Sequence, residues 1–115
     1  MTVIYFNPSC SKCNLSLDLL KSKDIQPTVI NYLETPPSKE ELKNILNMMG
    51  KQPQDIIRFF EQPAKALNLS AQDDRPLDEW LDIMVTHPIL IQRPIVVNGD
   101  KAVVARPPEN LLDII

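Results

Sequence analysis

Hydrophobic and polar positions follow two different periods along this chain of 115 residues. The apolar run at 2–6 is β-branched and aromatic and ends at an Asn-Pro pair, which predicts a short buried strand. A helix is expected over about residues 9–23, and a second β-branched run covers 27–32. A strand, a helix and a strand in about thirty residues predict two parallel strands with a right-handed crossover.

The middle of the chain carries apolar residues at helical spacing. Ser38 and Glu41 form a capping box for one helix, and Gly50 follows that helix as its C-cap. A short helix starting at Pro53 is expected to carry Ile56 to Phe60, and another turn of helix is expected around 63–67. Pro76 is expected at the first position of a further helix. Apolar stripes of this kind predict core packing.

The C-terminal part has a hairpin pattern. Residues 95–97 and 102–105 read as strands, and Asn98-Gly99 between them favours a type I′ turn. A last helix is expected from 107 through Ile114. The element order is βαβ, helices, then ββα, which is similar to an α/β thioredoxin-like fold with a helical insertion at about 38–88. We therefore expect one domain over 1–115, and the similarity implies a cis-proline at Pro94.

Both cysteines of the chain lie in one Cys-x-x-Cys motif, Cys10 and Cys13, after the first strand. This spacing at a helix N-terminus allows a disulfide, and the amide groups and dipole there lower a thiol pKa. Cys10 is the candidate nucleophile and Cys13 the candidate resolving thiol, with Lys12 as a possible extra positive charge. Two alternatives stay open: half of a zinc site, with His87 as the remaining soft ligand, or packing of both thiols in the core.

Composition narrows the classes of function. The net charge of −3 and the pI near 5.0 argue against non-specific nucleic-acid binding. The chain shows neither a signal-peptide pattern nor an apolar run of about 20 residues, so we expect a cytoplasmic protein with no membrane or direct nucleic-acid partner. In that compartment a Cys-x-x-Cys indicates redox or catalytic chemistry.

Several separated motifs resemble the glutaredoxin-coupled arsenate reductase (ArsC) family. They are NPSCSK at 7–12, YLETPP at 32–37, LNL at 67–69, HPILIQRPIVV at 87–97 and ARPPE at 105–109. The resemblance covers nearly the whole chain. It implies a catalytic cysteine at Cys10 and an oxyanion site made by Arg58, Arg93 and Arg106, since guanidinium groups bind such anions with charge-assisted hydrogen bonds. The residues expected to shape this site are Asn7, Pro8, Ser11, Lys12 and Pro94.

The resemblance also implies a mechanism. The Cys10 thiolate would attack arsenate, and a second thiol would then attack the Cys10 sulfur and release arsenite. No tightly bound cofactor and no metal are expected. In the family the second thiol is glutathione, acting as co-substrate, and glutaredoxin then resets the enzyme; with Cys13 present, an internal disulfide reset by thioredoxin or glutaredoxin is the other route.

The chain departs from the family pattern at three positions. Members with established arsenate activity have a histidine directly before Asn-Pro, where this chain has Phe6; Cys13 and Asn14 stand where close relatives have serine and arginine. A Cys-x-x-Cys at this place also resembles Spx-like regulators, which bind RNA polymerase and use the disulfide as a switch. That function, or a thiol-disulfide oxidoreductase with another substrate, is the alternative.

Overall fold

A computed structural model describes residues 1–115, and the chain divides into two compact units. The first unit combines Met1–Thr35 with Arg93–Ile115, and the second is Pro36–Gln92. None of the helices combines the length and apolar character needed to cross a membrane. The single domain with an insertion at about 38–88 stays a prediction.

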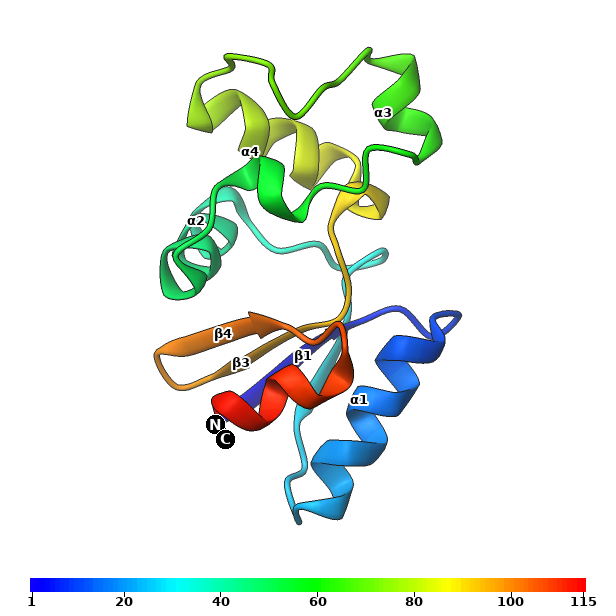
Figure 1. Cartoon of the computed structure of the whole chain (residues 1–115), viewed down its shortest axis with the longest axis vertical. Helices are drawn as coiled ribbons and strands as arrows, with labels where there is room; N and C mark the ends of the chain where they lie inside the picture. Colours follow the sequence, from blue (N-terminus) through cyan, green and yellow to red (C-terminus); the bar gives the residue numbers. More distant parts are fainter. The chain divides into compact units, whose positions relative to one another are not determined.

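The first unit is built on a four-stranded sheet in the order β2-β1-β3-β4 (Figure 1). Its strands are β1 (Thr2–Phe6), β2 (Thr28–Asn31), β3 (Ile95–Asn98) and β4 (Lys101–Val104). β1 pairs parallel with β2 and antiparallel with β3, and β3 pairs antiparallel with β4. The predicted parallel strands and the predicted hairpin are confirmed, and the order fits a thioredoxin-like fold.

One face of this sheet is covered by α1 (Ser11–Ser22) and the 3-10 helix η3 (Pro108–Asp113), which lie side by side (Figure 1). Their shared core contains residues of β1, α1, β3 and η3 and of the segments beside them: Ile4, Phe6, Cys10, Cys13, Leu20, Val96, Ala105 and Leu111. Ile4 and Phe6 point to the same face because side chains alternate along a strand. Both thiols therefore belong to the packed side of the sheet.

The turn of the hairpin differs from the prediction. Asn98 pairs with Lys101, so the two loop residues are Gly99 and Asp100, and Asn98-Gly99 was the wrong pair. Gly99 has φ +63° while Asp100 does not have a positive φ, which fits a type II′ turn and not the expected type I′. Asn98 stays in the strand because its side chain accepts from Thr2 Oγ1 at 3.1 Å and donates to the Ile114 carbonyl at 2.7 Å.

The second unit is helical. It contains α2 (Lys39–Met49), the 3-10 helix η1 (Pro53–Ile56), α3 (Gln62–Ala66), α4 (Leu77–Thr86) and the 3-10 helix η2 (Pro88–Leu90). The predicted capping box of Ser38 and Glu41 is confirmed, and Gly50 ends α2 with φ +65°. The buried side chains of the two longest helices are Leu42, Ile45, Leu46, Trp80, Leu81 and Met84.

Two boundaries in this unit were predicted wrongly. The helix at Pro53 ends at Ile56 and does not continue to Phe60, because Ile57 forms an isolated antiparallel bridge with Ile91. Flanking backbone bonds hold this bridge: Arg58 N–H donates to the Leu90 carbonyl at 2.7 Å, and Gln92 N–H to the Ile56 carbonyl at 2.8 Å. Pro76 is the N-cap of α4 and not its first helical residue.

Candidate active site

The loop between β1 and α1 is held by Asn7. Its side-chain oxygen accepts from Ser9 N–H at 2.9 Å, and its carbonyl accepts from Cys10 N–H at 3.0 Å. Asn14 closes the loop from the helix side, since its amide donates to the carbonyls of Pro8 at 3.4 Å and Cys10 at 3.2 Å. Asn7 is 5% exposed, so this loop is anchored in the interior at its start.

Cys10 is the N-cap residue of α1 and is 8% exposed. Burial alone raises the pKa of a thiol, but here it is outweighed by hydrogen bonds to the Cys10 sulfur. They come from the Cys13 N–H, the Arg93 guanidinium, the Cys13 thiol and the Lys12 N–H, and together they lower the pKa of Cys10 to about 7. Near neutral pH a large share of Cys10 is therefore thiolate, the nucleophilic form.

Cys13 has the opposite character. It is fully buried, and burial raises its pKa to about 12, only partly offset by the Asn7 N–H, which donates to its sulfur at 3.4 Å. Both thiols are free in this structure. Cys13 thus serves as a neutral hydrogen-bond partner of Cys10 here.

Arg93 and Arg106 flank the hairpin, since Arg93 lies just before β3 and Arg106 just after β4. The Arg93 guanidinium hydrogen-bonds the Cys10 sulfur, and Arg106 Nη1 donates to the Arg93 carbonyl at 3.1 Å. Between them, the peptide bond before Pro94 is cis, as the thioredoxin-like pattern implied, and the Pro94 carbonyl accepts from Ala105 N–H at 2.9 Å. The structure therefore brings Arg93 to the thiol and places Arg106, an exposed residue, against the backbone of Arg93.

Sequence reasoning missed Tyr32 as a member of this site. Tyr32 is 1% exposed and its hydroxyl hydrogen-bonds the Arg93 guanidinium. The signal was available, because parallel strands end at the same edge of a sheet: Phe6 pairs with Asn31, so the residues that follow them, Asn7 and Tyr32, are neighbours.

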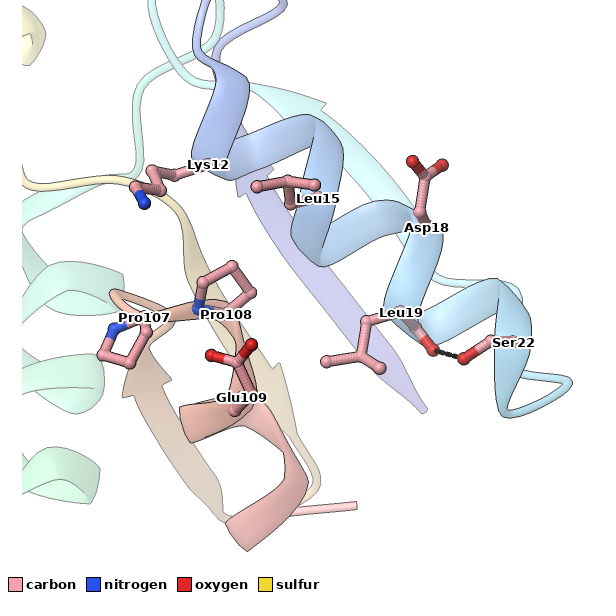
Figure 2. A pocket seen from close by; sticks show the side chains of 8 residues that line it. All are labelled: Lys12, Leu15, Asp18, Leu19, Ser22, Pro107, Pro108 and Glu109. Carbon is pink, nitrogen blue, oxygen red and sulfur yellow. Dashed lines mark hydrogen bonds between the residues drawn. The ribbon is translucent and has the colours of Figure 1, made fainter.

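Lys12 contributes to the thiol through its backbone, and its side chain lies elsewhere. It lines an open groove of about 490 Å³ between α1 and η3, together with Leu15, Leu19, Pro107 and other residues (Figure 2). Figure 2 shows Lys12 at the start of α1, with Pro107 and Pro108 among the other residues that line the groove. Ser11 is exposed at the first position of α1, and Pro8 is exposed in the loop.

Arg58 belongs to the second unit and has its partners there. Its Nε lies 3.0 Å from Glu61 Oε2, its Nη1 is 3.5 Å from Gln92 Oε1, and its guanidinium carbon is 4.6 Å from the centre of the Phe60 ring. The predicted joint action of Arg58 with Arg93 and Arg106 stays a prediction.

The chemistry that the first unit supports is that of an activated thiolate beside a cation. No group of three or more His, Cys, Asp or Glu side chains is placed to hold a metal ion. A thiol that ionises near neutral pH, with a guanidinium at its sulfur, is suited to attack a negatively charged electrophile. The positive guanidinium reduces the repulsion between the negative thiolate and the negative electrophile.

Known proteins resemble this chain in both sequence and structure. The ArsC family profile matches residues 5–114. An arsenate reductase of Escherichia coli is 42% identical over 112 residues, which are 97% of this chain and 79% of that protein. The uncharacterised protein YfgD of E. coli K12 is 41% identical over 115 residues, covering 97% of this chain and 94% of that protein. In structure, an arsenate reductase from Vibrio cholerae superposes with a TM-score of 0.93 at 43% identity, over 99% of this chain and 97% of the other.

Proposed function

The chain belongs to the ArsC family, and we propose on this basis that it reduces arsenate to arsenite with Cys10 as the nucleophile. The observation that carries the proposal is the Cys10 sulfur at the start of α1, hydrogen-bonded by Arg93 and with its pKa lowered to about 7. An arsenate reductase needs a thiolate and a bound oxyanion at the same place, and this site offers both a thiolate and a guanidinium.

The proposed reaction has two chemical steps in which two electrons reach arsenic. The Cys10 thiolate attacks As(V) and forms an S–As bond, while one arsenate oxygen leaves as water after taking up protons. A second thiolate then attacks the Cys10 sulfur, the S–As bond breaks, and its electron pair stays on arsenic as arsenite. Cys10 is left in a disulfide, which an external thiol system must reduce.

The positive charges have a defined task in this scheme. Arg93 lies at the sulfur and would hold the charge of the thiol–arsenate adduct. Arg106 is joined to the same hairpin end, and Arg58 is carried over from the family resemblance as a third oxyanion-binding arginine. Because Phe6 packs in the core with both thiols and has no ring nitrogen, the tuning of Cys10 falls to Arg93 and the helix amides.

Glutathione is our proposed second thiol, with glutaredoxin as the reductant of the mixed disulfide. The state of Cys13 supports this choice over an internal disulfide. Cys13 is fully buried and burial raises its pKa to about 12, so it is a poor attacking thiolate in this conformation. An internal Cys10–Cys13 disulfide would first require Cys13 to lose its proton.

Arsenate-dependent NADPH oxidation tests the proposal, with glutathione, glutaredoxin and glutathione reductase in one assay and thioredoxin with thioredoxin reductase in the other. Native protein should turn over with glutathione and glutaredoxin, and Cys10→Ser should lose at least about a thousandfold in kcat because the nucleophile is gone. Cys13→Ser should keep most of this activity. If the native protein shows no turnover with either reductant, arsenate is not the substrate, and the leading functions become a redox switch at Cys10 and Cys13 or a thiol-disulfide oxidoreductase with another substrate.

A further inference from the structure

Two segments flank the end of β1 from opposite sides. The register pairs Phe6 with Asn31 of β2 and Tyr5 with Ile95 of β3. Continued past the strand ends, this register puts Tyr32 beside the start of the loop on one side and Arg93 beside it on the other. A hydrogen bond between Tyr32 and Arg93 therefore bridges the end of β1, directly at the loop that leads to Cys10.

The tyrosine end of this bridge is rigid. Tyr32 is 1% exposed, so its ring is fixed by packing and its hydroxyl has little freedom. Arg93, in contrast, is half-buried on a long side chain with several rotatable bonds. A guanidinium of this kind reaches one geometry only when fixed partners hold it, and its partners here are the Cys10 sulfur and the Tyr32 hydroxyl.

The chemistry of the partner also matters. Arg93 donates to the phenol oxygen of Tyr32, and the ordinary pKa of a phenol is about 10. The phenol orients the guanidinium without cancelling its positive charge. A carboxylate in the same place would orient Arg93 equally well but would compete with both the thiolate and an incoming oxyanion.

We propose that Tyr32 is a positioning residue, whose hydroxyl holds the Arg93 guanidinium on the Cys10 sulfur with its charge available to an oxyanion. Tyr32 acts through Arg93 and makes no contact with substrate. The inference deepens the proposed function and rests on it for the substrate. The positioning of Arg93 on the thiolate, however, can be measured without any substrate.

The test is Tyr32→Phe, which keeps the buried ring and removes the hydroxyl. The first readout is the rate at which iodoacetamide alkylates Cys10 as a function of pH. We expect the midpoint of this profile to rise above that of native protein, because a mobile Arg93 stabilises the thiolate less. The second readout is arsenate reduction, where KM should rise about three- to tenfold, the size of one hydrogen bond, with a smaller change in kcat.

A double-mutant cycle shows whether Tyr32 acts through Arg93. In an Arg93→Lys background, adding Tyr32→Phe should have little further effect on the alkylation midpoint or on KM. If Tyr32→Phe has the same effect in both backgrounds, or none in native protein, the proposal is overturned.

Tyr5→Phe is the matched control, because it removes a hydroxyl from the other tyrosine of the chain, on β1. It should leave the alkylation midpoint unchanged, and a shift equal to that of Tyr32→Phe would point to a general effect on the sheet and overturn the positioning role. Urea unfolding of each variant confirms that the fold is kept. If native protein lacks arsenate turnover, the proposed function fails, while the alkylation profiles still decide the role of Tyr32.

Discussion

The two compact units each hold an arginine among buried side chains, and the partners of these arginines differ. In the second unit Arg58 is 8% exposed and forms an ion pair with the carboxylate of Glu61 at 3.0 Å. In the first unit the guanidinium of Arg93 meets a thiol and a phenol, Cys10 and Tyr32. The partner of Arg58 is thus a carboxylate within its own unit, whereas the guanidinium of Arg93 meets the ionisable sulfur of Cys10.

The difference shows that the partner of a buried guanidinium decides whether the arginine has a structural or a chemical role. A carboxylate partner satisfies a buried guanidinium at every pH above its own pKa, which suits a structural role. A thiol and a phenol accept hydrogen bonds from the guanidinium without a permanent negative charge, which leaves the positive charge to a reacting group. Arg93 has the partners expected of a residue that takes part in the reaction, whereas the charge of Arg58 is partly neutralised by Glu61.

Of the substitutions that test this comparison, Arg93→Lys should have the largest effect on arsenate reduction. Lysine keeps the charge but loses the planar fork that contacts Cys10 and Tyr32 together. We expect kcat/KM for arsenate to fall about 10²- to 10³-fold, the usual loss for one transition-state charge contact. Steady-state kinetics with glutathione and glutaredoxin measures it, and a loss below tenfold would contradict the central place of Arg93.

Arg58→Lys should have a smaller effect. Because Arg58 already pairs with Glu61, we expect kcat/KM to fall by about tenfold or less, mainly through KM. The free energy of unfolding should fall by about 1 kcal/mol as the geometry of this pair worsens. Arg75→Lys is the matched control, since Arg75 pairs with Asp73 and Glu79 in the same unit. Equal losses in kcat/KM for Arg93→Lys and Arg58→Lys would erase the difference between the two arginines.

Cys13→Ala should have the smallest effect of the three substitutions. The effect should appear in the pH dependence of Cys10 alkylation. In native protein the rate of Cys10 alkylation should rise with pH to a plateau, with its midpoint near 7, because only the thiolate reacts. Alanine keeps the backbone N–H at position 13 and removes the thiol that hydrogen-bonds Cys10, so the midpoint should rise by up to about one unit. Mass spectrometry of alkylated Cys10 measures it, and a midpoint that falls would show that Cys13 does not stabilise the thiolate.

Much of the first unit could be predicted because its signals are local. The β-branched run of β1, the Asn-Pro that follows it and the Cys-x-x-Cys placed Cys10 at a helix start. The capping box of Ser38 and Glu41 was equally local and is confirmed. Such features depend on residues within a few positions of each other, so the sequence alone carries them.

What could not be predicted depends on partners that lie far away in the chain. Ile57 leaves the expected helix because Ile91 pairs with it, 34 positions later. Asn98 stays in β3 because Thr2 and Ile114 bind its side chain, which moves the turn by one residue. The parallel register of β1 and β2 brings Tyr32 beside Asn7, but its contact with Arg93 also depends on the pairing of β1 with β3, which lies far along the chain.

The attachment of two site arginines to one hairpin has a consequence for how the site tolerates insertions and deletions. Arg93 and Arg106 lie just outside β3 and β4, whose ends pair as Ile95 with Val104, and Arg106 also binds the Arg93 carbonyl. Lengthening the turn at Gly99–Asp100 leaves this pairing in place. A single residue inserted within either strand shifts the register by one and turns each following side chain to the opposite face. The hairpin can therefore change in length at its tip. A residue added to β3 or β4, in contrast, must be matched in the other strand if Arg93 and Arg106 are to stay together.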